Sequence, residues 1–478
     1  MPTRSGYWVL LIFFLALGCR TAHGQVSNPD YKPLKLPSGD PFPSSEAELL
    51  HMRDKPDGEA IRRMRAHAWD ILGGLVAGAD PIWDTWYTKC DLYLEVDKCG
   101  SGLKQKTPSP RRLLRSLEIP AQSLNSLESL APDSQAQAVP SGTYREALAK
   151  FIADFRAKPQ VASVLFDQEA ADHITNNCLF PDDNVGQHRK PSDCPPIPIA
   201  PGKVATFPKA SVVIKAIWAI VGPDQTEITV FSPELWNEIH SAARTSENNP
   251  YNFRESMTID LSPGKPCPGD KIEDKSVPLN CFYHTEPLTK EDLDTIPRGI
   301  VHLGSVNNWK VGNSLVLLGL HVTTKEIGDW VWATFWWNKR VTSDWHGNGR
   351  PNTLRSAPWN RYLTDTTLSG MTPFEQDGGP KICFNPFLET DANIQHGIIS
   401  NCLQCHSKAA FGSVPQVDPY KLGVLNRDGQ RLASGDHPVP EYFDTMVSTD
   451  FIWSIADAQN HRVRKVVMDL QVVAQALK

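Results

Sequence analysis

The chain of 478 residues lacks several features that would point directly to a function. It has 48 Lys and Arg against 54 Asp and Glu residues, and this net charge of −6 argues against a nucleic-acid binder that relies on phosphate neutralisation. It contains no G-x-S-x-G elbow, no H-E-x-x-H pair and no P-loop. Beyond the N-terminal apolar run, no segment approaches the ~20 apolar residues that a membrane-spanning helix needs.

Proline and tryptophan, in contrast, are abundant. The 39 Pro residues indicate many ordered loops, and the 14 Trp residues indicate aromatic-rich cores or a binding surface. With 40% apolar and 21% charged residues, a chain of this length can bury more than one core. We therefore expect two or three domains.

A C-x-x-C-H motif lies near the C-terminus, in Asn401-Cys402-Leu403-Gln404-Cys405-His406. Two thiols three positions apart can add to the two vinyl groups on one edge of a heme, and the next histidine can ligate the iron. The composition gives about 0.006 chance matches to this motif. The motif predicts one covalently attached heme c, with Cys402 and Cys405 as thioether residues and His406 as the proximal iron ligand.

Two other interpretations of the motif fit less well. A thioredoxin-type cysteine pair opens a helix after a strand in a βαβ unit, and no such pattern surrounds Cys402. A four-ligand zinc site needs a second Cys or His pair at similar spacing, and the sequence has none.

The N-terminus predicts export. Arg4 precedes an apolar run from Tyr7 to Leu17, which is too short to span a bilayer and fits a cleaved signal peptide over residues 1–24. An alternative cleavage before Cys19 would leave a lipid-anchored protein, and an uncleaved anchor is a further alternative. We expect a periplasmic or otherwise exported protein that contacts the membrane only if Cys19 carries lipid. In bacteria, heme is joined to C-x-x-C-H proteins in that compartment.

The remaining cysteines suggest disulfides. Six of them form three local couples, which predict the bonds Cys90–Cys99, Cys178–Cys194 and Cys267–Cys281. Cys383 is the odd residue, and we predict a buried free thiol, with a redox or ligand role as the alternative.

The hydrophobic pattern predicts an α+β fold in three parts. Residues 25–199 should form a helical region with a flexible insertion at about 100–142, residues 200–345 an antiparallel β domain with helical insertions, and residues 346–478 a mainly α, cytochrome c-like heme segment. Capping boxes at Ser45 and Thr143 predict two helix starts. The expected strands are residues 211–221, 227–231, 313–323 and 330–337, the last two joined by a turn at 325–329.

Aromatic residues concentrate in the last of these strands. Trp330, Trp332, Phe335, Trp336 and Trp337 form a band that we interpret as sheet core with one covered face, in preference to a ligand platform. Within the heme segment we expect a helix at 391–400 and a final helix capped by Thr449-Asp450 that runs to residue 477.

The ligand opposite His406 should decide what the iron does, because Met ligation raises the potential and an open site permits small-molecule binding. Met446 is the preferred methionine, while Met468 has the pattern of a core residue on an amphipathic helix. A distal histidine is the alternative, with His321 favoured because it follows the apolar run 315–320. The other distal histidine candidates are His346, His396 and His437. Five-coordinate iron is the remaining alternative.

Residues 400–406, with Thr449-Asp450-Phe451-Ile452-Trp453-Ser454-Ile455 downstream, resemble large single-heme cytochrome c family proteins of Gram-negative bacteria. The resemblance extends back through residues 214–218, 319–321 and 332–335 and does not include the insertion at 100–142. It implies an exported heme protein and assigns no substrate. Only Cys402, Cys405 and His406 carry over to this chain as site residues.

Electron transfer with a redox partner protein is the expected function. The alternatives are a heme-dependent oxidoreductase, or a heme-based binding or sensor protein, with the active site between the heme and the β domain. A di-heme peroxidase is disfavoured because it needs a second C-x-x-C-H motif, and the sequence contains one.

Overall fold

We describe a computed structural model of the chain. The described residues are 29–55, 57–93, 110–120, 127, 142–180, 191–196, 198–232, 254–269, 271–272, 274–340, 346–368, 382–389, 401–412, 443–459 and 461–477. The expected signal peptide and Cys19, and the helix expected at 391–400, lie outside them.

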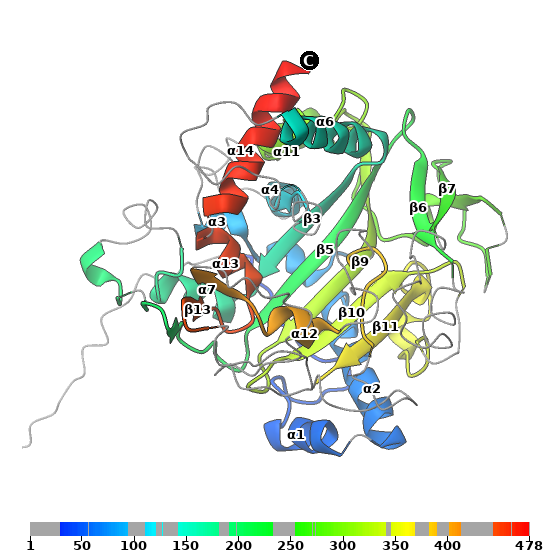
Figure 1. The fold of residues 1–478 in the computed structure, drawn as a ribbon. Coiled ribbons are helices and arrows are strands. Elements are labelled where there is room, and N and C mark those ends of the chain that lie inside the picture. The colour runs from blue at the N-terminus through cyan, green and yellow to red at the C-terminus, as the bar shows by residue number, and fades with distance from the viewer. Residues whose placement is uncertain are drawn as a thin grey trace, which may run out of the picture.

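A seven-stranded antiparallel sheet forms the centre of the molecule (Figure 1). Its order is β1 (Tyr87–Thr88), β3 (Gln160–Phe166), β5 (Val212–Val221), β9 (Ser314–Thr324), β10 (Val331–Trp337) and β11 (Tyr362–Thr367), and β2 (Leu117–Glu118) also pairs with β3. Strands β5, β9 and β10 consist almost entirely of buried residues, which fits a sheet that is covered on both faces.

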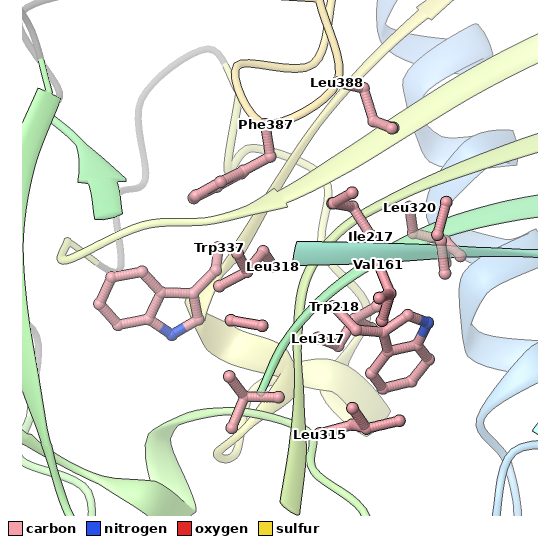
Figure 2. Packing of buried hydrophobic residues seen from close by; sticks show 14 of the residues in the cluster. Val161, Ile217, Trp218, Leu315, Leu317, Leu318, Leu320, Trp337, Phe387 and Leu388 are labelled. Carbon is pink, nitrogen blue, oxygen red and sulfur yellow. The ribbon is translucent and has the colours of Figure 1, made fainter. Parts of the chain in front are cut away.

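Helix α2 (Gly58–Leu75) covers one face of this sheet. Its Trp69 ring lies 5.6 Å from the Phe335 ring of β10, and both belong to the largest hydrophobic cluster of the molecule. Figure 2 shows another part of that cluster, where Trp218 and Leu317 lie close together. Asp57 caps the start of this helix, since its side chain accepts a hydrogen bond from the Ala60 amide.

A second hydrophobic cluster covers the opposite face. Sheet residues Val164, Phe166 and Trp332 pack there against Cys402 and Phe451 from the C-terminal part of the chain. The elements on this side include α7 (Gln168–Asn176), α12 (Cys402–His406) and α13 (Trp453–Gln459). The C-x-x-C-H motif therefore lies on a face of the sheet that is separate from α2.

Further helices complete the molecule. Helices α6 (Gly142–Ala157), α11 (Arg298–Leu303) and α14 (His461–Ala476) pack together at one end of the sheet (Figure 1). The other helices among the described residues are α1 (Glu46–Asp54), α3 (Lys89–Tyr93), α4 (Pro110–Arg115) and α10 (Lys290–Thr295), with 3-10 turns at Ile82–Thr85, Pro191–Asp193, Leu279–Cys281, Asn352–Leu354 and Trp359–Arg361. No helix among the described residues is long and apolar enough to cross a membrane.

Two small sheets flank the large one. The first orders β12 (Ala410–Gly412), β13 (Met446–Ser448) and β4 (Gly202–Lys203), and the second orders β6 (Glu227–Phe231), β7 (Arg254–Asp260) and β8 (Ser276–Pro278). In the first sheet, β12 follows α12, and its partner β13 precedes the turn at Phe451. Strand β13 also pairs with β4, which lies far earlier in the chain.

The predicted strands of the middle segment are confirmed, but the large sheet is not confined to that segment. Strands β1, β2 and β3 come from the region predicted to be helical, and β11 comes from the predicted heme segment. The predicted flexible insertion is wrong for residues 110–120, since α4 and β2 place Leu113, Leu114 and Leu117 in the main core.

The predicted helix caps are also corrected. Helix α1 starts at Glu46 as expected, but the Ser45 side chain makes no capping hydrogen bond, and Thr143 lies inside α6. The single final helix that we predicted is divided into two helices, α13 and α14. Thr449 and Asp450 do not cap either of them. The Thr449 hydroxyl donates to backbone carbonyls, and Asp450 is engaged by a distant lysine.

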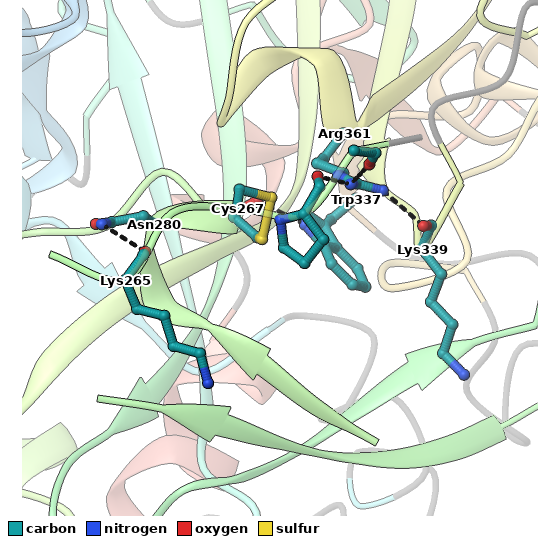
Figure 3. Close-up of a disulfide and its surroundings, with 9 residues drawn as sticks. Lys265, Cys267, Asn280, Trp337, Lys339 and Arg361 are labelled. Atoms are coloured by element: carbon teal, nitrogen blue, oxygen red, sulfur yellow. Dashed lines mark hydrogen bonds between the residues drawn. A yellow bond between two sulfur atoms is a disulfide. The ribbon is translucent and has the colours of Figure 1, made fainter. Parts of the chain in front are cut away.

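Two of the three predicted disulfides are present, Cys178–Cys194 and Cys267–Cys281. Each closes a loop of about 15 residues, which the chain-entropy model values at about 3 kcal/mol. Figure 3 shows the second bond, beside which Trp337 donates to the Cys281 carbonyl at 2.8 Å. The third predicted pair, Cys90–Cys99, includes Cys99, which lies outside the described residues.

Candidate functional site

The two motif cysteines lie on one short helix. Helix α12 spans Cys402–His406, so Cys402 and Cys405 are three residues apart and lie on the same side of it. Cys402 is buried and Cys405 is partly exposed. This arrangement presents two thiols together, with His406 at the end of the same helix.

The ring of His406 is held from two directions. Its Nδ1 atom lies 2.8 Å from the Phe451 carbonyl oxygen, and its ring centroid lies 4.4 Å from that of Trp332 on β10. A carbonyl only accepts, so Nδ1 must carry the proton and donate it. The Nε2 atom then keeps its lone pair. This is the tautomer in which a histidine can bind a metal through Nε2.

The surroundings also keep this ring neutral. Burial lowers the pKa of His406 to about 3, the hydrogen bond to Phe451 opposes this shift, and the charges of His321 and Lys215 add to it. At neutral pH the imidazole is therefore uncharged, and no proton has to leave before Nε2 can bind a metal.

The carbonyl that holds His406 belongs to a tight turn. The Ile452 amide donates to the Thr449 carbonyl at 3.1 Å, and the two central residues, Asp450 and Phe451, have φ of +51° and +72°. Two successive positive φ angles are typical of a type I′ turn, in which glycine, asparagine and aspartate are the usual residues. A left-handed conformation costs about 1–2 kcal/mol per residue, and Phe451 has a bulky side chain.

A third thiol lies beside the motif. The Sγ atoms of Cys383 and Cys402 are 4.0 Å apart in the second hydrophobic cluster, and the backbone of Cys383 forms a parallel bridge with Asn401. The hydrogen bond with Cys383 and burial raise the pKa of Cys402 well above its ordinary value, and burial raises that of Cys405. Cys383 is a buried free thiol, as predicted, but its contact with Cys402 was not foreseen.

His321 lies on the same face of the sheet within a group of charged residues that the sequence analysis did not predict. Strand register places Lys215 of β5 beside His321 of β9, and His321 Nε2 lies 2.6 Å from Glu389 Oε1. Lys89 forms an ion pair with Glu118 at 2.7 Å. Lys215 was the one sign of this polar group in the sequence, because it interrupts an otherwise apolar strand.

Burial shifts the pKa values of two residues in this polar group. Burial lowers the pKa of Lys215, while Glu118 and Asp457 oppose this shift and the charge of Lys89 adds to it. Burial also raises the pKa of Asp457 on α13, which Lys89 opposes. The face that carries the motif therefore combines apolar packing around Cys402 with a partly enclosed set of charged side chains.

The candidates for the iron ligand opposite His406 have different surroundings in the structure. His321 lies on the face that carries the motif, but its Nε2 is engaged by Glu389. Val447, and not its neighbour Met446, belongs to the cluster around Cys402, and successive strand residues point to opposite sides. His346 is buried beside Trp336, with Nδ1 3.3 Å from the Thr364 carbonyl oxygen. His396 and His437 lie outside the described residues.

Two expectations about side-chain burial have opposite outcomes. Met468, read as a core residue, is 56% exposed, because α14 presents that position to solvent. The aromatic band is buried at all five positions, which confirms its interpretation as sheet core. Trp332, however, reaches from that core to the His406 ring.

Within the described ranges, no group of three or more His, Cys, Asp or Glu side chains is arranged to hold a metal ion. Comparisons with protein-family models, with curated proteins and with solved structures found no match to this chain.

Proposed function

We propose that the chain is an exported c-type cytochrome that carries one covalently attached heme and transfers electrons to or from a redox partner protein. The observation that carries this proposal is the state of His406. Its ring is neutral, oriented by Trp332 and by the Phe451 carbonyl, and protonated at Nδ1, so that Nε2 is ready to bind iron.

The donor set fits the group. Cys402 and Cys405 would form the thioethers, and His406 would be the proximal ligand. When bound, the heme would supply an iron that alternates between the ferrous and ferric states. The chain's own residues exclude water on the side of Cys402, where Trp332, Leu403 and Phe451 are all buried. The order α12, α13, α14 supports a cytochrome c-like segment within residues 346–478.

Export is part of the proposal. The two disulfides support an oxidising compartment, which heme attachment also requires. A periplasmic location, with or without lipid at Cys19, agrees with the apolar run at the N-terminus.

The test is whether heme resists extraction. The full chain is exported together with a heme-attachment system, purified and treated with acidified organic solvent, which removes non-covalent heme. We expect heme to remain with the polypeptide and to be lost in the double variant Cys402→Ala/Cys405→Ala. A purified, folded, exported protein without covalent heme would refute the proposal.

A heme-dependent oxidoreductase is the second candidate, and the His321–Glu389 pair favours it. A carboxylate that accepts from the imidazole makes an acid–base pair on the face that carries the motif. If the iron has an open site there, cyanide or carbon monoxide should change the optical spectrum, and His321→Gln should alter that change. His346→Gln is the matched control, because His346 is a buried histidine with a separate partner. A spectrum that no added ligand changes would favour the carrier.

A further inference from the structure

The turn that holds His406 is itself held by a buried ion pair. Lys325 Nζ donates to Asp450 Oδ1 at 2.8 Å, and the two side chains are only 2% and 0% exposed. The other carboxylate oxygen of Asp450 accepts from the Phe207 amide at 2.9 Å. Both oxygens of this carboxylate are therefore engaged by groups that lie far from it in the sequence.

The backbone of the same residue is fixed as well. The Asp450 carbonyl accepts from the indole nitrogen of Trp330 at 3.0 Å. Lys325 is itself fixed, because its Nζ also donates to the Gly328 carbonyl at 2.6 Å and lies 5.1 Å from the Trp330 ring centroid. The loop between β9 and β10 thus holds residue 450 by both its side chain and its main chain.

This contact explains how an unfavourable turn persists. Asp450 and Phe451 both have left-handed backbone angles, which persist only where surrounding contacts over-determine them. The next carbonyl after Asp450 is that of Phe451, which accepts the hydrogen bond from Nδ1 of His406. A rotation of the peptide groups in this turn would move that carbonyl away from the ring.

We propose that Lys325 and Asp450 form a clamp that holds the turn at residues 449–452 and thereby aims the Phe451 carbonyl at Nδ1 of His406. Lys325 and Asp450 are positioning residues that act through Phe451. For the heme the inference rests on the proposed function: a ring that donates strongly from Nδ1 is a more basic iron ligand, and it stabilises the ferric state. By keeping this hydrogen bond, the clamp therefore lowers the reduction potential of the heme.

Two variants test this without leaving a charge buried alone. Lys325→Met/Asp450→Ala and Lys325→Met/Asp450→Gly both remove the clamp and leave the net charge unchanged. They differ at one position, where glycine adopts the φ of +51° without strain and alanine does not. If the clamp acts by holding the turn, glycine should retain the carbonyl in place and alanine should not.

The first measurement is made on the heme-loaded protein. The alanine variant should have a higher midpoint potential and a lower iron–histidine stretching frequency than the parent, since His406 loses its hydrogen bond. The glycine variant should lie much closer to the parent. Equal shifts in both variants, or no shift in the alanine variant, would overturn the clamp.

The second measurement needs no heme. The full exported chain with Cys402→Ser/Cys405→Ser cannot attach heme, and nitrogen-15 chemical shifts of labelled histidine report which ring nitrogen of His406 is protonated. We expect the Nδ1 proton in this chain, loss of that preference with alanine at position 450 and its retention with glycine. An unchanged ring in the alanine variant refutes the clamp even if heme attaches, whereas absence of heme from the parent refutes only the proposed function.

Discussion

The sulfur atom of Cys383 lies 4.0 Å from that of Cys402, in a buried cluster to which Trp332 also belongs. The backbone bridge between Cys383 and Asn401 fixes this approach, so the two thiols meet wherever α12 is in place. Cys402 thus has two potential covalent fates, a thioether to heme or a disulfide to Cys383.

We predict that the heme-free exported chain forms a Cys383–Cys402 disulfide in oxidised glutathione. The two thiols lose two protons and two electrons, and glutathione leaves as two thiols. Mass spectrometry of alkylated, unreduced peptides measures the product. Cys383→Ser should leave Cys402 open to alkylation. Recovery of Cys402 linked mainly to Cys405 would contradict the prediction.

Removal of one heme thiol should leave heme attached through the other. In Cys402→Ala or Cys405→Ala, one thioether remains and one vinyl group is kept, so the absorption bands of the ferrous protein should move to longer wavelength. Cys383→Ala is the matched control and should retain the parent spectrum, because its thiol makes no thioether in the proposal. A parent-like spectrum in both single variants would rule out attachment through two thiols.

Lys325→Met alone should be strongly destabilising. It leaves the Asp450 carboxylate buried without its cation, a loss that commonly costs about 3–5 kcal/mol. Lys209→Met is the control, since its ion pair with Glu46 is solvent-exposed and should be worth about 0–1 kcal/mol. Denaturant unfolding measures both free energies. Similar losses in the two variants would show that burial of the Lys325 pair has little energetic weight.

Stability should fall with rising pH through the titration of Asp84. Burial, with a smaller contribution from Asp80, raises its pKa from 3.8 to about 7 in the folded state. Between these values the folded chain holds a proton that the unfolded chain has lost, so this contribution is full below pH ~4 and declines until pH ~7. The total change is about 4 kcal/mol.

Asp84→Asn should remove this dependence. Compared with the parent, the variant should be more stable at pH 8 and close to it at pH 4, in unfolding measured by circular dichroism. Asp54→Asn controls for the loss of one negative charge, since the Asp54 side chain is 60% exposed. A parallel pH profile for Asp84→Asn and the parent would show that Asp84 does not carry the effect.

The hairpin of β9 and β10 shows what the sequence could predict. Its strands are dense runs of β-branched and aromatic residues, and the turn between them is short, so local pattern determined both the type and the pairing. Strand β3 was missed, although Gln160–Phe166 has the same character, because the preceding helical pattern dominated that region.

Asp450 shows why the site could be predicted only in part. The spacing of Cys402, Cys405 and His406 is a local signal, and it led directly to the motif. An aspartate that follows Thr449 also has the pattern of a helix cap. In the structure, the Asp450 carboxylate instead accepts from Lys325, which is 125 residues away. Local sequence does not encode which distant lysine meets a carboxylate, so the turn and its role were not predicted.

Strand β11 has a consequence for how this chain can be divided. It is an edge strand of the large sheet, while β13 of the same C-terminal portion pairs in parallel with β4, more than 200 residues earlier. A fragment starting at residue 346 would lack Lys325, Trp330 and Trp332 and would expose one long side of β11. The C-x-x-C-H unit is therefore not a detachable module, and a miniature version of this protein must include the strands that support it.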